Sequence, residues 1–249
     1  MSTPANSSTA SPELPLRVLV VYYSRFGAIR ELAALVAEGA RQVAGVEAAL
    51  LEVEDQPIEE PRLAPDQTAV AETRGQVLAR RDKLLDRLAT ADALVFGAPA
   101  YFGSMAAPLK RFFEDSATAS SAVLDRTRPW HHYLFQDKPG AAFTSSATPH
   151  GGNEQALHSM LTLMMHLGMI VVTPGQQRPI LEQPAAPYGA TAITGASGYQ
   201  GLTAEERTEA VALGRRVAEV ASWLRAGRQV VAARQQQRQE AAQRYDPSA

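Results

Sequence analysis

The feature that most constrains the fold is a regular alternation of short apolar runs with amphipathic segments. Runs rich in β-branched and apolar residues occupy 17–23 (RVLVVYY), 46–53, 93–98 (ALVFGA), 141–145 (AAFTS) and 169–173 (MIVVT). Such runs are typical of strands buried on both faces. Apolar residues at helical spacing separate them, at 29–40, 73–88, 108–115 and 153–167. This order predicts an α/β fold, a doubly wound parallel sheet with helices on both faces.

The two ends of the chain differ from this core. Residues 1–15 are rich in Ser, Thr, Ala and Pro and are expected to form a disordered tail, with a short interaction motif as the alternative. One domain is expected over residues 16–228. The sequence from Thr203 to Glu206 (TAEE) reads as a capping box that starts a long last helix. Residues 229–249 are expected to extend that helix as a basic, Gln- and Arg-rich solvated segment, rather than to dock an acidic partner or nucleic acid.

Composition excludes several classes of protein. The 249 residues include no cysteine, which rules out disulfide scaffolds, thiolate metal sites and a cysteine nucleophile. Lys+Arg 24 against Asp+Glu 26 argues against a nucleic-acid binder, which normally carries a basic excess. No apolar run approaches the roughly 18 residues of a membrane span. With no targeting signal, a cytoplasmic location is expected, and the histidines show no metal-ligand spacing.

Three loops attract attention, because ligands of open α/β sheets bind at the carboxyl ends of the strands. The loop at 24–29 (SRFGAI) joins the first strand to the first helix, and open amides at a helix start suit a phosphate. It has neither a GxGxxG nor a P-loop pattern, so no P-loop lysine is expected. The alternative is that Ser24 merely caps the helix.

The other two loops combine aromatic rings, hydroxyls and glycines. In 98–105 (APAYFGSM), Tyr101 and Phe102 are suited to hold a flat ring, or else close the edge of the core. In 144–152 (TSSATPHGG), hydroxyls and paired glycines leave backbone amides free for a polar ligand, unless the segment is a plain surface turn.

Taken together, the motifs resemble a known family. YYSRFGAIRELA, FGAPAYFGSM, FTSSATPHGGNEQ, HLGMIVV and PYGATAI occur in order and resemble the flavodoxin-like type IV NAD(P)H:quinone oxidoreductases, the tryptophan-repressor-binding-protein-like family, over 17–224. The resemblance implies a flavodoxin-like, five-stranded parallel sheet of order 2-1-3-4-5 that binds FMN. It further implies two-electron, ping-pong hydride transfer from NADH or NADPH through FMN N5 to a quinone, in a homodimer or homotetramer.

The resemblance also assigns roles to residues. Those expected around the FMN phosphate are Ser24, Arg25, Phe26, Gly27, Ala28 and Ile29. Those expected along the flavin ring are Ala100, Tyr101, Phe102 and Gly103. Those expected on its pyrimidine side are Ser145, Ser146, Ala147, Thr148, Pro149 and Gly151. His166 would face the flavin and act on the quinone as the catalytic residue, while Phe26 and Trp130 would contact the substrates.

This sequence departs from the family pattern at several places. Ala28 stands where the family often has His, and Ala100-Tyr101 stands where it often has Thr-Arg. Residues 118–129 read as an insertion, and one extra residue falls near Pro149. These changes bear on the nicotinamide preference and on the quinone accepted.

Two other functions stay open on the sequence. One is a flavodoxin-type electron carrier, although such carriers are usually shorter and strongly acidic. The other is a non-enzymatic interaction protein that keeps the fold. From its neighbours alone, His166 is better explained as a structural histidine on the fourth helix, and only the resemblance favours an active-site position. A serine hydrolase is disfavoured because no GxSxG motif is present.

Overall fold

The computed structural model describes residues 14–55, 86–123, 132–176, 186–195 and 200–244. The N-terminal tail up to residue 13, most of the helix predicted at 73–88, and Trp130 lie outside these ranges. Residues 86–90, at the end of that predicted helix, are helical.

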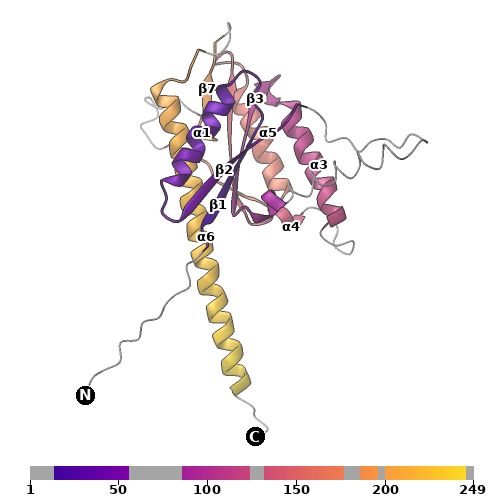
Figure 1. Cartoon of the computed structure of the whole chain (residues 1–249), viewed down its shortest axis with the longest axis vertical. Coiled ribbons are helices and arrows are strands. Elements are labelled where there is room, and N and C mark those ends of the chain that lie inside the picture. The colour runs from indigo at the N-terminus through magenta and orange to yellow at the C-terminus, as the bar shows by residue number, and fades with distance from the viewer. Residues whose placement is uncertain (1–13, 56–85, 124–131, 177–185, 196–199, 245–249) are drawn as a thin grey trace, which may run out of the picture.

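A parallel sheet forms the centre of the molecule (Figure 1). Its main strands are β1 (Leu16–Tyr22), β2 (Val46–Glu52), β3 (Ala93–Tyr101), β5 (Pro139–Ser146) and β6 (Ile170–Val171), in the order β2-β1-β3-β5-β6. Along this path the order corresponds to the expected 2-1-3-4-5, and the α/β, flavodoxin-like fold is confirmed. Strands β1, β3 and β5 are almost wholly buried, as their continuous apolar runs predict.

The sheet has seven strands within the described ranges, so the expectation of five was wrong in two places. Strand β4 (Ser104–Met105) folds back antiparallel to the end of β3. The expected fifth strand at 169–173 is split, because β6 pairs only with Pro139 and Gly140. Strand β7 (Ala190–Ile193), which was expected to be loop, pairs with the carboxyl half of β5. The apolar run at 169–173 is too short to pair along the whole of β5. A segment containing Pro and Gly separates β6 from β7, the two strands that pair with the two ends of β5.

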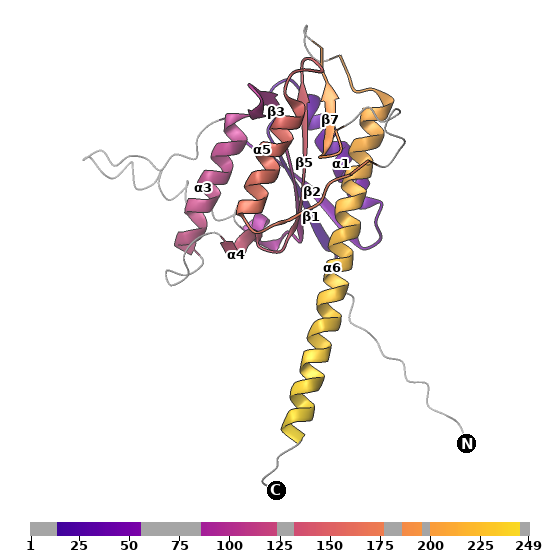
Figure 2. The ribbon, with the colours of Figure 1, turned by 180° about the vertical axis from the view of Figure 1, so that it is seen from behind.

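Helices cover both faces of the sheet, as expected for a doubly wound fold. Helices α1 (Ala28–Arg41) and α6 (Ala204–Arg244) lie on one face, and α3 (Ala107–Val123), α4 (His132–Phe135) and α5 (Asn153–His166) on the other (Figures 1 and 2). Helix α3 is longer than the predicted 108–115 and includes the start of the segment that reads as an insertion. In the described part of the chain, no helix has the length and apolar character needed to cross a bilayer.

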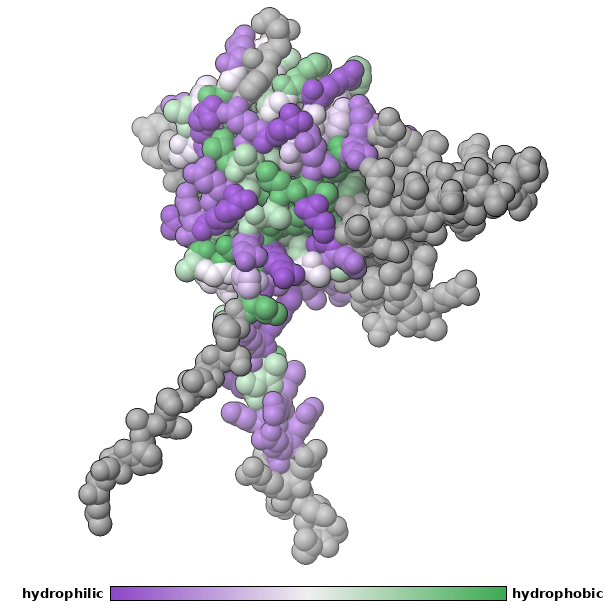
Figure 3. Space-filling view, viewed as in Figure 1, coloured by the Kyte–Doolittle hydropathy of each residue, from purple (hydrophilic) through white to green (hydrophobic). Residues whose placement is uncertain are grey.

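Helix α6 begins at the expected capping box and runs past the sheet. The Thr203 amide donates to Glu206 Oε2 at 2.8 Å, and the Glu206 amide donates to Thr203 Oγ1 at 3.2 Å. Arg225 and Arg228 hold the helix at the edge of the domain, through Asp92 Oδ2 at 2.6 Å and the Asp137 carbonyl at 2.7 Å. Residues 226–240 are exposed and mostly hydrophilic (Figure 3), so this part of α6 projects as a solvated helix.

Two glycines let α1 and α6 approach each other at backbone distance. A Cβ atom at Gly39 would lie 1.9 Å from the Val211 carbonyl oxygen, and one at Gly214 would lie 1.8 Å from the Val36 carbonyl oxygen. Both obstacles are helix backbone, which cannot yield as a flexible side chain would. The contact between the two helices therefore depends on the absence of these two side chains.

We predict that Gly39→Ala and Gly214→Ala each lower the free energy of unfolding by about 1–3 kcal/mol, because the helices must separate. This loss opposes the gain of about 1 kcal/mol that alanine normally brings inside a helix. Gly227→Ala is the matched control on α6, because a Cβ there meets nothing within 4 Å. Urea denaturation measures all three, and equal stabilisation by the three substitutions would contradict the close-packing account.

Candidate functional site

The carboxyl ends of β1, β3 and β5 lie at one edge of the sheet, and the three loops follow there (Figure 1). The loops after β3 and β5 touch through glycines, since a Cβ at Gly152 would lie 2.8 Å from Gly103 Cα. The loop after β1 is fixed beside β3 by a hydrogen bond of 2.9 Å from the Tyr23 amide to the Gly97 carbonyl. The structure thus brings the expected residues of the three loops to one edge.

The loop after β1 leads to the start of α1, where the backbone amides of two buried residues have no acceptor in the described part of the chain. Ser24 Oγ accepts hydrogen bonds of 3.2 Å from the amides of Gly27 and Arg30, so Ser24 does cap the helix, as the alternative interpretation held. The amides of Ala28 and Ile29 have no acceptor among the described residues. Gly27 has φ 104°, which a side chain would strain. These amides at the positive end of α1 suit an anionic group.

The loop after β3 is a tight hairpin that displays an aromatic ring. Tyr101 pairs with Ser104, so Phe102 and Gly103 form its two-residue turn, with φ 51° and 71°. Positive φ at both positions is typical of a type I′ turn, which favours Asn or Gly over Phe. Phe102 is nevertheless fully exposed. A strained, exposed aromatic residue at a strand end indicates a role in binding rather than in folding.

Tyr101, in contrast, faces inward. Its ring packs against the core, so the core alternative describes it better than the flat-ring interpretation does. Its hydroxyl is buried and has no hydrogen-bond partner among the described residues. A buried hydroxyl is costly to leave without a hydrogen bond, so the Tyr101 hydroxyl is available to a partner beyond the described residues.

The loop after β5 is tied down at its base and open at its tip. Ser146 Oγ donates to the Thr148 carbonyl at 2.8 Å, and the Gly151 amide donates to the same carbonyl at 2.9 Å. Ser145 and Ser146 are buried. The amides of Ala147 and Thr148, together with the exposed Pro149, form the tip, and those amides have no acceptor within the described part of the chain.

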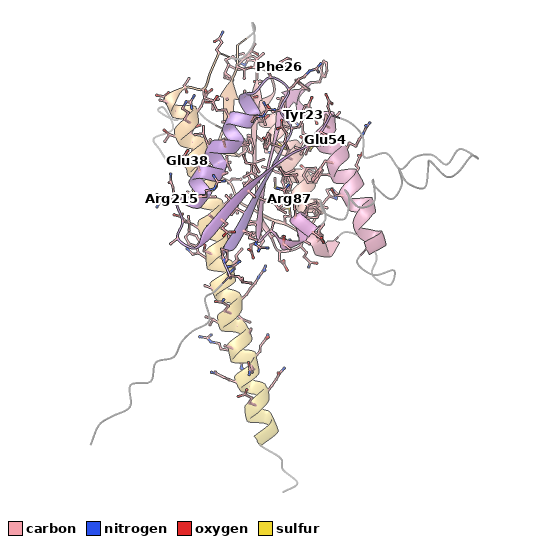
Figure 4. All side chains as sticks on the ribbon, in the orientation of Figure 1. Tyr23, Phe26, Glu38, Glu54, Arg87 and Arg215 are labelled. Carbon is pink, nitrogen blue, oxygen red and sulfur yellow. The ribbon has the colours of Figure 1, made fainter. Side chains whose placement is uncertain are left out.

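Carboxylates surround the outer side of the loop after β1. Glu52 accepts two hydrogen bonds from Arg30, the shorter of 2.6 Å, and a third of 3.2 Å from the Tyr22 hydroxyl. Burial, followed by the charge of Glu52, raises the pKa of Tyr22. Tyr23 donates to Asp55 Oδ2 at 3.1 Å, and burial together with this hydrogen bond raises the pKa of Tyr23. Tyr23, Glu54 and Phe26 lie at the same end of the sheet (Figure 4).

His166 is not brought to the three loops within one chain. It is the last residue of α5, which starts at the carboxyl edge and runs back along the sheet for 14 residues, or about 20 Å. The Asp137 amide donates to the Gly168 carbonyl at 2.9 Å, which places the end of α5 beside the start of β5. The side chain of His166 is exposed at this amino edge. A helix that follows a parallel strand must return to the opposite edge, so His166 cannot face the loops of its own chain.

Lys138 lies at the amino edge as well and is committed there. Its Nζ donates to the Leu88 and Ala89 carbonyls at 2.8 Å each, and burial lowers the pKa of Lys138 to about 8. It therefore closes the helix end at 86–90 and is no candidate for a phosphate at the carboxyl edge.

Sequence reasoning missed two residues that shape the loop after β5. Gly152 has φ 86° and precedes α5, and the paired glycines at 151–152 were a usable signal. Asn153 is buried and donates from Nδ2 to the Ala192 carbonyl at 3.3 Å, which joins α5 to β7. No signal predicted this contact, because β7 itself was not expected.

This edge can bind an anionic group beside a flat ring. The open amides of Ala28 and Ile29 suit the anion, and the exposed rings of Phe26 and Phe102 offer surfaces for stacking. Phe26 is 72% exposed at the mouth of the site. The unpartnered hydroxyl of Tyr101 and the open tip of the loop after β5 supply polar groups nearby.

Comparison with known proteins agrees with this geometry. Residues 17–177 match the family described as NADPH-dependent FMN reductase. A protein of Paracoccus denitrificans named NAD(P)H dehydrogenase (quinone) is 36% identical over 225 residues, covering 87% of this chain and 99% of its own. One of the same name from Solidesulfovibrio magneticus is 36% identical over 216 residues, covering 85% and 100%.

Solved structures extend the comparison. The crystal structure of "the flavodoxin, WrbA-like protein" from Agrobacterium tumefaciens has a TM-score of 0.54 and 26% identity, covering 84% of this chain and 98% of that one. An archaeal flavodoxin, with a TM-score of 0.51 and 18% identity, covers 83% and 99% and shows the shared fold. The matched family spans most of the sheet and all three loops, and the two named relatives are covered almost completely. The chain therefore belongs to the NADPH-dependent FMN reductase family.

Proposed function

We propose that this protein is an FMN-dependent NAD(P)H:quinone oxidoreductase. The observation that carries the proposal is the meeting, at one sheet edge, of open amides at the start of α1 with two exposed aromatic rings. Relatives named NAD(P)H dehydrogenase (quinone) cover most of the chain at 34–36% identity, which supports the same activity here. When bound, FMN would supply the redox chemistry, which is hydride acceptance from the nicotinamide and two-electron transfer to the quinone.

The phosphate of the flavin would bind at the start of α1. The amides of Ala28 and Ile29 would donate to it, while Ser24 keeps the next amide of the turn occupied. No lysine is needed, because the helix end supplies both the donors and the partial positive charge. This choice of groups favours FMN, which carries a phosphate, over a flavin that lacks one.

The ring of the flavin would lie between the other two loops. Phe102 would form one wall, with Ala100 and Tyr101 along its edge and Gly103 allowing close approach. On the polar side of the ring, the amides of Ala147 and Thr148 would donate to carbonyl oxygens. The buried Ser145 and Ser146 would hold that loop in place, with Gly151 packed against Ser146.

We propose further that His166 completes the site of a second copy in a homodimer or homotetramer. The three loops of its own chain lie at the other edge of the sheet. The side chain of His166 is exposed in a segment that also exposes two apolar residues, Met165 at 61% and Ile170 at 37%. Exposed apolar side chains of this kind are suited to pack against the exposed rings of Phe26 and Phe102 in a second copy. In that position the imidazole would donate a hydrogen bond to the quinone oxygen. Trp130, predicted to contact the substrate, lies outside the described residues.

The function is tested by an absorbance spectrum of the purified protein. We expect flavin bands that bleach when NADH or NADPH is added without oxygen and recover when benzoquinone follows. A flavin that neither donor bleaches would support the electron-carrier alternative. Protein with no flavin and no affinity for FMN would support the non-enzymatic alternative.

We predict that Phe102→Asn stabilises the fold and weakens the site. Asparagine tolerates positive φ at the first turn position, so relief of strain should add up to about 1 kcal/mol to the free energy of unfolding. Loss of the ring should raise the dissociation constant of FMN or the KM of the quinone. Thermal unfolding of the flavin-free protein and a fluorescence titration measure the two effects separately. A variant that is less stable and binds normally would show that Phe102 has only a structural role.

We predict that two defective chains restore each other when co-expressed. His166→Ala should bind FMN but turn over quinone slowly, and Gly27→Val, which strains a φ of 104°, should fail to bind FMN. A mixed oligomer joins intact loops from the first chain with His166 from the second. Activity above the sum of the separate variants is expected. Strictly additive activity would show that the two edges do not meet, and an unchanged His166→Ala would remove its catalytic role.

A further inference from the structure

Arg25 is an exposed cation at the mouth of the site, and no acceptor engages it among the described residues. Its guanidinium lies 5.7 Å from the centre of the Phe26 ring, which is itself exposed. An arginine resting on an aromatic face is held in a limited set of positions but keeps its donors free. This arrangement leaves a planar, permanent positive charge exposed on the loop after β1.

The other charged groups described near this loop are either paired with each other or negative. Arg30 is bound to Glu52 through both of its guanidinium nitrogens that face it. The loops at 98–105 and 144–152 contain no lysine or arginine. Glu54 and Asp55 follow β2 on the same side of the molecule. Tyr23 donates a hydrogen bond to Asp55, and the charge of Arg25 lowers the pKa of Tyr23 against the larger effects of burial and of Asp55. Within the described ranges, an anion that enters here therefore meets the carboxylates of Glu54 and Asp55 and the guanidinium of Arg25.

We propose that Arg25 binds the pyrophosphate of the nicotinamide dinucleotide and thereby favours the binding of the anionic electron donor over that of the neutral quinone. The proposal rests on the proposed function and refines it. A shared site must accept two unlike molecules in turn, because the donor is a polyanion and a simple quinone is neutral. A cation at the mouth attracts the donor without holding the acceptor, so the two half-reactions can use one space.

The pyrophosphate is favoured over the two other phosphates that Arg25 could meet. The flavin phosphate has the open amides of Ala28 and Ile29 along the axis of α1, whereas Arg25 lies over the ring of Phe26. The 2′-phosphate distinguishes NADPH from NADH and sits at the far, adenosine end of the molecule. The pyrophosphate is separated from the nicotinamide by a single ribose and is common to both donors. Arg25 would therefore act on NADH and NADPH alike.

The test compares Arg25→Gln with Arg111→Gln, a control that removes one exposed arginine from α3. For Arg25→Gln we expect the KM values of NADH and NADPH to rise by similar factors of about 3–10, as expected for one partly exposed charged hydrogen bond. The KM of benzoquinone should stay unchanged. The dissociation constant of FMN, measured for each variant, separates the proposed role from the expected place of Arg25 in the loop around the FMN phosphate. The control should match the unaltered protein in all four constants.

A binding measurement without turnover completes the experiment. Calorimetric titration of NAD⁺ into the flavin-loaded protein should give a dissociation constant raised by a similar factor of about 3–10 in Arg25→Gln. The kcat/KM for NADH should fall with added salt in the unaltered protein and much less so in this variant.

Each other outcome overturns the proposal in a recognisable way. A rise in KM confined to NADPH would assign Arg25 to the 2′-phosphate, and a loss of FMN affinity would assign Arg25 to the flavin phosphate. Equal rises in the KM values of the dinucleotides and of benzoquinone would mean that the substitution disturbs the whole site rather than one contact. Unaltered protein that binds no flavin or oxidises neither donor would refute the proposed function itself, and with it the basis of this inference.

Discussion

The parallel pairing of β1, β3 and β5 is the constraint on which the rest of the molecule depends. Parallel neighbours must all end at the same edge, so the loops that follow them converge without any contact between distant side chains being required. The register is fixed by the burial of these strands on both faces, because a slip of one residue would exchange the side chains that pack on each face. The positions of Ser24, Phe102 and Ser146 follow directly from this arrangement.

The same constraint separates the two edges by function. The carboxyl edge carries open amides, exposed rings and a strained turn, all of which favour a ligand at the expense of stability. The amino edge carries hydrogen bonds that hold elements together. Arg225 donates to Asp92, Arg228 donates to the Asp137 carbonyl, and Lys138 donates to the Leu88 carbonyl at the helix end at 86–90. A second copy that places its amino edge, with His166, over this carboxyl edge would join a stable surface to a reactive one.

The sequence allowed most of the fold to be predicted, because the signals were local. Continuous apolar runs located β1, β3 and β5, and the pattern from Thr203 to Glu206 located the start of α6. The split of the last strand was not predictable in this way, since β6 has two residues and β7 was hidden among Pro and Gly. The closeness of α1 and α6 also depends on which glycines face each other, which only the packed structure reveals.

The site was predictable as a set of loops but not in its geometry. The order of the motifs indicated the three loops, whereas the positive φ of Phe102 depends on a two-residue hairpin that no periodicity marks. The distance of His166 from those loops follows from the direction of α5, and its predicted role therefore needs a second chain. Asn153 was missed because its partner strand was missed.

The start of α1 is proposed to bind a phosphate through its backbone amides, and the most direct test is the affinity of the flavin-free protein for FMN and for riboflavin. Riboflavin has the same ring and lacks only the phosphate. Fluorescence titration should give a dissociation constant for FMN at least about 100-fold lower, corresponding to about 2.7 kcal/mol for the charged contacts. Equal dissociation constants for the two flavins would contradict this proposal, because the amides of Ala28 and Ile29 would then contribute nothing to the affinity for FMN.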